Sequence, residues 1–232
     1  MQAELERAIE SVTGKLPRIT AAGRTDAGAH ALGQVIAFGT ESHLPEESLE
    51  LAINARLPRD IVVRDLREVA HSFHPRFDAR SRTYRYVIWN APQRSPLLSD
   101  RAAHIRKPLD VERMNRALRL IVGRHDFTTF VSSSAVGRRM REIICASVER
   151  HGGEIWVELE GNGFMRQMIR SIVGTLIDVG LGRISVEEFD EIARSGDRSR
   201  AGATAPARGL YLLSVQYAEE ADRRSAHAEE LL

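Results

Sequence analysis

The feature that most constrains the fold is an approximate repeat in the order of the predicted elements. The second half reads strand, helix, strand, strand, helix, short helix and strand when residues 82–89 are counted with it. The first half reads helix, strand, strand, helix and strand, which is the same order without an opening strand. Two ferredoxin-like βαββαβ units have this order, so we predict an α+β fold made of two such subdomains.

Hydrophobic periodicity, caps and turn residues place the individual elements. Helices are expected from the start of the chain to Gly14, from Pro45 to Leu57, from Asp110 to about Val122, from Phe164 to Val179 behind an Asn162 cap, and after a capping box at Ser185. Strands are expected at 18–22, 34–38, 61–69, 83–89, 143–150, 154–160 and 210–217. Two of these strands form a hairpin around Gly152-Gly153.

The composition excludes several classes of protein. The 232 residues are 43% hydrophobic and 28% charged, as in globular proteins, and no apolar segment reaches membrane-spanning length. No signal peptide is visible, so we expect a cytoplasmic protein. Cys145 is the only cysteine, which excludes an internal disulfide, and its apolar neighbours predict a buried thiol.

The charge is balanced but unusual in its chemistry. The formal net charge is only +1, and Lys15 and Lys107 are the only lysines, so nearly all positive charge is arginine. Arginine offers a planar fork to phosphate and a flat face to bases. The same bias also follows from a GC-rich coding sequence, so composition alone does not choose between the two explanations.

A glycine-rich loop carries the polar residues that suggest chemistry. Gly23, Gly28 and Gly33 flank a set of four polar side chains, which are Arg24, Thr25, Asp26 and His30. Glycine permits positive φ and close approach of a ligand, and an arginine beside a carboxylate keeps it ionised. Taken alone, the pattern favours an Asx turn in a long hairpin with a solvated arginine.

A resemblance changes that interpretation. The run Gly23-Arg24-Thr25-Asp26-Ala27-Gly28-Ala29-His30-Ala31 resembles the active-site motif of the tRNA pseudouridine synthase A (TruA) family. Further blocks at 54–61, 73–86, 161–174 and 205–212 also resemble the family, in the family's order. The family usually begins with a strand and loop of Tyr-Asp-Gly and Gly-Trp-Gln type, to which this chain has no counterpart.

The resemblance implies an enzyme that converts uridine to pseudouridine in the anticodon arm of tRNA, at positions 38 to 40. The reaction breaks the N-glycosidic bond and re-forms a C–C bond at C5, with no metal or organic cofactor. The resemblance also implies a homodimer and an RNA-binding cleft between two subdomains. Asp26 would supply the carboxylate, which attacks the base, attacks the sugar or removes a ribose proton; the sequence leaves these routes open.

The family's other site residues carry over one by one. Tyr84 corresponds to the family's active-site tyrosine, which stacks on the uracil and is a candidate for removing the C5 proton. Arg170 corresponds to a basic residue that pairs with the carboxylate. Arg24 resembles the arginine that fills the space left by the target base, although an ion pair with Asp26 is the alternative. Leu210 resembles an apolar residue that packs on the flipped base. The remaining predicted substrate contacts are Thr25, His30, Arg80 and Arg82. Arg80 and Arg82 are candidate phosphate contacts that a solvated face explains equally well.

Several side chains stay open to a structural interpretation. Arg85 and the cluster Arg138-Arg139-Arg141 are equally well explained as phosphate contacts or as a solvated face. His71 and His74 have no third ligand nearby, so we predict structural histidines and no metal site.

We predict three segments: an N-terminal catalytic subdomain at 1–90 carrying the Asp26 loop, a C-terminal subdomain at 91–218, and a charged, frayed tail at 219–232. Proline and polar residues from Asn90 to Ser99 mark the expected connection. An opening strand is normally interior to its sheet, so we expect the numbering to start downstream of a first strand. A non-catalytic ferredoxin-like RNA-binding protein is the main alternative if that strand is essential. An Asp-dependent metallohydrolase is a remoter one.

Overall fold

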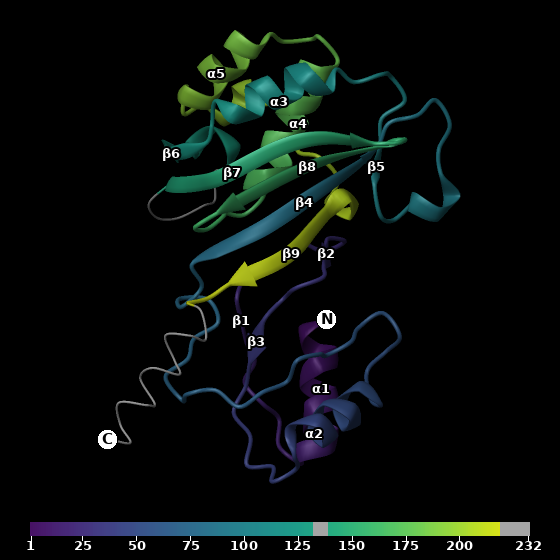
Figure 1. Ribbon diagram of the computed structural model, residues 1–232, viewed down its shortest axis with the longest axis vertical. Helices are drawn as coiled ribbons and strands as arrows, with labels where there is room; N and C mark the ends of the chain where they lie inside the picture. The colour runs from purple at the N-terminus through teal and green to yellow at the C-terminus, as the bar shows by residue number, and fades with distance from the viewer. Residues whose placement is uncertain (132–138, 219–232) are drawn as a thin grey trace. The chain divides into compact units, whose positions relative to one another are not determined.

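The computed structural model describes residues 1–131 and 139–218 (Figure 1). Its contacts divide the chain into two compact units: residues 1–23 with 35–78, and residues 24–34 with the chain from 79 onward. The division differs from the boundary predicted at residue 90, because the strand before that point pairs entirely within the second unit. The predicted connection at 90–99 therefore lies inside this unit. The predicted frayed tail and most of the polar segment before Met140 lie outside the described residues.

The second unit is built on a seven-stranded sheet in the order β2-β9-β4-β8-β7-β6, with β5 paired to the end of β4. The strands are β2 (His30–Ala31), β4 (Ser81–Trp89), β5 (Ala103–His104), β6 (Gly123–Asp126), β7 (Met140–His151), β8 (Glu154–Gly161) and β9 (Leu210–Gln216). Strand β4 lies inside the sheet, antiparallel to both β8 and β9. The order β9-β4-β8-β7 is that of a ferredoxin-like unit, and the α+β class is confirmed.

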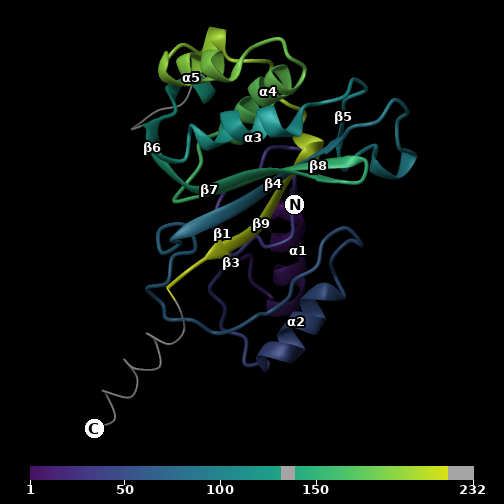
Figure 2. The same ribbon diagram turned by 45° about the horizontal axis from the view of Figure 1, so that its top comes forward.

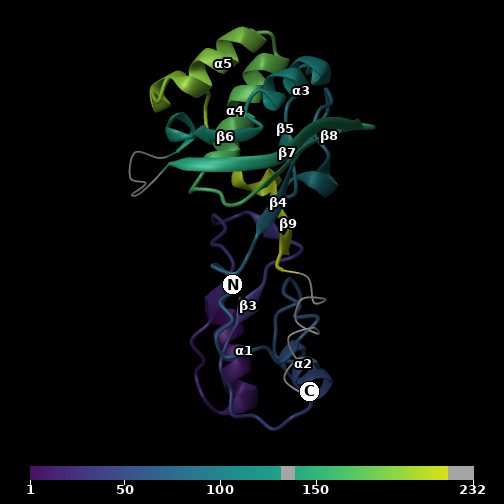
Figure 3. The ribbon, with the colours of Figure 1, turned by 60° about the vertical axis from the view of Figure 1, so that its left-hand side comes forward.

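Three helices lie on one face of this sheet, as the views in Figures 1, 2 and 3 agree. They are α3 (Val111–Arg119), α4 (Met168–Gly180) and α5 (Val186–Arg194). Two predicted caps are confirmed: the Asp110 carboxylate accepts from the Arg113 N–H (2.9 Å), and the Ser185 hydroxyl accepts from the Glu188 N–H (3.0 Å). The sheet and the apolar faces of these helices enclose the core of the unit.

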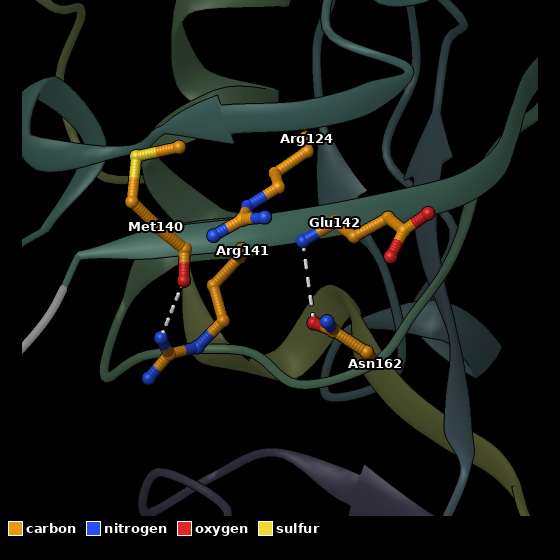
Figure 4. A pocket seen from close by; sticks show the side chains of 5 residues that line it. All are labelled: Arg124, Met140, Arg141, Glu142 and Asn162. Atoms are coloured by element: carbon orange, nitrogen blue, oxygen red, sulfur yellow. Dashed lines mark hydrogen bonds between the residues drawn. The ribbon is translucent and has the colours of Figure 1, made fainter.

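The predicted cap of α4 is wrong. The helix begins at Met168, after Gln167 in the left-handed region at φ 62°, and Asn162 lies well before it. Asn162 instead extends the β7–β8 ladder: its N–H donates to the Glu142 carbonyl (3.1 Å), and its Oδ1 accepts from the Glu142 N–H (3.2 Å). The Asn162 side chain, which was predicted to cap the helix, is thus hydrogen-bonded to the sheet (Figure 4).

The prediction of a buried Cys145 is also wrong, since this thiol is exposed. The β7–β8 register shifts between Ile143 and Cys145. Ile143 points into the core, and the irregularity turns Cys145 away from it.

A segment that leads into β9 runs unusually close to α4. A Cβ atom on Gly174 would lie 1.8 Å from the Ala203 carbonyl oxygen, so only glycine fits at this helical position. The approach is held by two hydrogen bonds, from the Ala205 N–H to the Arg170 carbonyl (3.0 Å) and from the Gly202 N–H to the Thr175 hydroxyl (3.0 Å). Residues 202–205 are therefore fixed beside residues 170–175 of α4.

The first unit contains α1 (Gln2–Thr13), β1 (Thr20–Ala21), β3 (Ile36–Ala37) and α2 (Glu46–Asn54). The two helices share a small core of Ala8, Ile9, Leu49 and Ile53, and the two strands pair antiparallel. Helix α1 ends as predicted, with Gly14 at φ 74°.

The strand predicted at 61–69 is wrong, because these residues form no ladder in the described chain. Side chains of α2 bind this backbone instead. Asn54 donates to the Val63 carbonyl and accepts from the Val63 N–H, both at 2.7 Å, and Glu50 accepts from the Leu66 N–H (2.8 Å). Side chains of α2 thus hold this segment in place of strand partners.

Candidate active site

Residues 24–34 of the glycine-rich loop belong to the second unit, where one short ladder fixes them. His30 and Ala31 of β2 lie opposite Tyr211 and Leu212 of β9 in a parallel ladder. Gly28 adopts φ 82°, and a Cβ on Gly33 would lie 2.3 Å from the Leu213 carbonyl oxygen. Gly28 is thus required by a left-handed turn, and Gly33 by the close approach of the Leu213 backbone.

The loop directs Asp26 toward the start of α4. Nη1 of Arg170 donates to Oδ2 of Asp26, and Nε of the same guanidinium donates to the Ala205 carbonyl (2.7 Å). The Arg170 side chain is 15% exposed and the Asp26 side chain 22%, so their attraction is less screened than that of a surface pair. The Ala29 N–H meets the Asp26 carbonyl rather than its carboxylate, so the described contacts do not make Asp26 an Asx turn.

Tyr84 lies on β4 at the wall of the same site. Its side chain is buried, and its ring meets Phe164 edge-on with centroids 5.3 Å apart. Burial raises the pKa of the phenol, the positive charge of Arg82 lowers it, and the negative charge of Asp26 adds to the rise. Because burial dominates and the pKa is raised overall, the phenol is neutral at physiological pH.

The raised Tyr84 pKa predicts a specific loss of stability in alkali. A phenol whose pKa is higher in the folded than in the unfolded chain stabilises the fold below about pH 10, the unfolded value. This contribution disappears as the pH rises through the folded pKa. We therefore expect the free energy of unfolding to fall more steeply above pH 10 in the wild type than in Tyr84→Phe. Urea unfolding of both proteins between pH 8 and 11 tests this, and parallel curves would contradict it.

Other predicted site residues lie in different surroundings. Arg24 is exposed, Thr25 is half-buried, and Leu210 is buried at the first position of β9. His30 is engaged by the protein: its ring stacks on Tyr211 at 4.7 Å and its Nε2 lies 2.9 Å from the Asp100 carbonyl oxygen. In this structure His30 anchors the loop.

Arg80 and Arg82, two further predicted substrate contacts, differ in their surroundings. Arg82 Nη1 donates to the carbonyls of Ala79 (3.2 Å) and Asn162 (2.9 Å), so its guanidinium is held against the loop after β8. Arg80 is exposed, and its N–H donates to the Gln216 carbonyl (2.8 Å). The structure therefore brings Asp26, Arg170 and Tyr84 together, and places Arg80 away from this group at the strand's beginning.

Two groups that hold Arg170 and its neighbouring segment in place were not predicted from the sequence. The Ala205 carbonyl orients Arg170, and the hydroxyl of the buried Tyr86 donates to the Pro206 carbonyl (2.7 Å), which holds the same segment. Burial raises the pKa of Tyr86 strongly, so it remains a donor. Backbone carbonyls carry no side-chain signal in a sequence. Tyr86 alternates correctly for a strand core but gives no indication of its partner.

The described chain offers no evident metal centre. Within residues 1–131 and 139–218, no three His, Cys, Asp or Glu side chains gather in a way that could hold an ion. His74 of the first unit takes part in a turn instead, where its Nδ1 accepts from the N–H groups of Arg76 (3.2 Å) and Phe77 (3.3 Å). Over the same described ranges, no helix has the length and apolar character needed to cross a bilayer.

Comparison with known proteins gives the class to which this fold and loop belong, that of the pseudouridine synthases. A family model described as tRNA pseudouridine synthase matches residues 1–78 and 117–218. Curated relatives named tRNA pseudouridine synthase A include those of Brevibacillus brevis, 45% identical over 218 residues, and Acetivibrio thermocellus, 44% identical over 218 residues. Each alignment covers 94% of this chain and 89% of the relative.

The chain belongs to the tRNA pseudouridine synthase family, and the relatives that it matches are of the A type. It is an isomerase that acts on tRNA.

Proposed function

We propose that this chain isomerises uridine to pseudouridine in the anticodon arm of tRNA, at positions 38 to 40, with Asp26 as the catalytic carboxylate. The observation that carries the proposal is the placement of Asp26: a partly buried acid, paired with Arg170, beside the neutral phenol of Tyr84. Attack on the base, attack on the sugar and removal of a ribose proton all require an ionised carboxylate held in place. The Arg170 guanidinium holds the Asp26 carboxylate in place.

The geometry leaves part of the acid for the substrate. Arg170 binds Oδ2, and Oδ1 of Asp26 accepts no hydrogen bond from the described residues. Arg170 is itself oriented by the Ala205 carbonyl, so the pair is arranged before RNA binds. Tyr84 would offer a flat, uncharged ring to the uracil.

The target nucleoside has to leave the base stack to reach Asp26, and this unstacking requires compensating contacts. Arg24 is exposed two residues before Asp26, which suits a contact with the RNA that surrounds the extruded nucleoside. Thr25, His30, Leu210, Arg80 and Arg82 complete the proposed substrate-binding set. Of these, His30 would act by holding the loop. Following the resemblance, we also propose that the active form is a homodimer.

The test uses tRNA labelled with tritium at C5 of uridine, because isomerisation releases that atom to solvent. We expect release from anticodon arms that retain uridine at 38, 39 or 40, and none from an arm in which all three are cytidine. Added chelator should not change the rate. Binding without any release would support the non-catalytic alternative, and release from the cytidine-substituted arm would contradict the proposed positions.

A further inference from the structure

The segment that leads into β9 holds the active-site arginine at two points. The Ala205 N–H donates to the Arg170 backbone carbonyl (3.0 Å), and the Ala205 carbonyl accepts from Arg170 Nε (2.7 Å). Nη1 of the same guanidinium donates to Oδ2 of Asp26. A guanidinium is planar and rigid, so a contact that orients Nε also orients Nη1. The place of the Ala205 carbonyl therefore sets how Arg170 meets Asp26.

The buried Tyr86 holds this segment just after Ala205. Its hydroxyl donates to the Pro206 carbonyl (2.7 Å), and its ring packs directly on the following backbone, where a Cβ on Gly209 would lie 2.6 Å from Cζ. The pyrrolidine ring fixes φ of Pro206, here −55°, and the peptide bond before it is planar. Only ψ of Pro206 is then a soft torsion between the two carbonyls. Anchoring the Pro206 carbonyl thus helps to anchor that of Ala205.

Arg198 holds the same segment from its other end. This residue begins the 3₁₀ turn Arg198–Arg200, and its side chain is half-buried. Its Nη1 donates to the carbonyls of Ala201 (3.3 Å) and Gly202 (3.2 Å), and its Nη2 donates to the Thr204 hydroxyl (2.8 Å). One guanidinium therefore fastens three of the residues that precede Ala205.

We propose that Tyr86 and Arg198 are positioning residues for the isomerisation, which keep the Ala205 carbonyl where it directs Arg170 toward Asp26. The proposal rests on the proposed function, because that function gives the Asp26 carboxylate its chemical role. Tyr86 is fully buried and offers no surface to an RNA. Groups that are arranged in advance accelerate a reaction only while they are held in place. Loosening the segment should therefore slow the chemical step and spare tRNA binding.

Tyr86→Phe tests the first anchor by removing a single hydroxyl. We expect single-turnover tritium release to slow about tenfold, the scale of one lost hydrogen bond. The Kd for tRNA should stay within about threefold of the wild type. Thr129→Val is the matched control, because Thr129 is also fully buried in this unit and donates to a backbone carbonyl, that of Ala193 (3.3 Å). The control should melt earlier than the wild type but keep its rate.

Arg198→Met tests the second anchor from outside the core. We again expect a rate about tenfold lower with little change in Kd. Arg200→Met is the control, because Arg200 lies in the same turn but is exposed and meets only the Glu191 carboxylate (3.7 Å) among the ion pairs of the described residues. Arg198→Met carries the test alone if Tyr86→Phe does not fold.

An Arg170→Met background separates positioning from a general loss of structure. Tyr86 and Arg198 act through Arg170, so either substitution should change the rate of Arg170→Met by less than about twofold. A merely structural role would slow both backgrounds by the same factor.

The outcomes separate these positioning roles from the proposed function. Equal slowing in both backgrounds, or variants that match their controls, would overturn the positioning roles and leave a wild type that releases tritium with its function intact. Losses that vanish in Arg170→Met would uphold them. They would do so even with release from uridines outside positions 38 to 40, which would overturn the proposed positions alone. Absence of release by the wild type would overturn both proposals.

Discussion

Asp26→Asn is expected to lower the rate of pseudouridine formation by at least about 10⁴-fold, the scale seen when an essential catalytic group is removed. The amide has nearly the same shape and can still accept a hydrogen bond from Arg170, but it cannot act as a nucleophile or a base at neutral pH. The loop is fixed independently by its pairing with β9, so the fold should persist. Single-turnover tritium release from labelled tRNA measures the effect.

Binding distinguishes a chemical role of Asp26 from a structural one. We expect the Kd of Asp26→Asn for tRNA to stay within about threefold of the wild type, because the RNA backbone supplies most of the affinity. Asp60→Asn in the first unit, an exposed aspartate, is the matched control and should retain full activity. Turnover by Asp26→Asn near the wild-type rate would remove this residue from the catalytic role.

The second large effect is expected at Arg170. Arg170→Met removes the partner of Asp26 and the donor to Ala205, which should slow turnover by about 10² to 10³-fold, the range for losing one pre-organised electrostatic group. Breaking a fully buried ion pair costs about 3–5 kcal/mol. This pair keeps partial contact with solvent, so a smaller loss of about 1–3 kcal/mol in unfolding free energy is expected.

A double-mutant cycle isolates the pair from the rest of the site. In an Asp26→Asn background no carboxylate is left without its partner, so Arg170→Met should destabilise less than it does in the wild type. Arg170→Lys keeps the charge but not the fork that spans Asp26 and Ala205, and we expect an intermediate rate. Equal destabilisation in both backgrounds would show that Asp26 and Arg170 are not energetically coupled.

Local signals predicted much of the second unit. The Asp110 and Ser185 caps, the strand at 83–89 and the β7–β8 hairpin each depend on neighbours in sequence, and the structure has all of them. The α4 cap failed because Asn162 can satisfy either a helix end or a strand, and the distant Glu142 decides between them. The strand expected at 61–69 failed for a similar reason, since Asn54 supplies the bonds that a neighbouring strand would have made.

Part of the candidate site was predicted, and that part came from the family resemblance rather than from hydrophobic periodicity. Nothing in the spacing of Asp26 and Arg170 indicates that residues so far apart in sequence should meet. The role of β2 was not predicted because a two-residue strand has no measurable alternation, and it pairs with the last strand of the unit. The anchoring of His30 by Tyr211 and Asp100 depends on that pairing and was equally hidden.

The division of the chain into two units has a consequence for tests by mutation. The polypeptide passes from one unit to the other three times, after residues 23, 34 and 78, yet the acid, its guanidinium and the phenol all reside in a single body. Substitutions confined to residues 35–78 leave the proposed catalytic residues and their unit unaltered, so we expect them to lower turnover less than Asp26→Asn or Arg170→Met does.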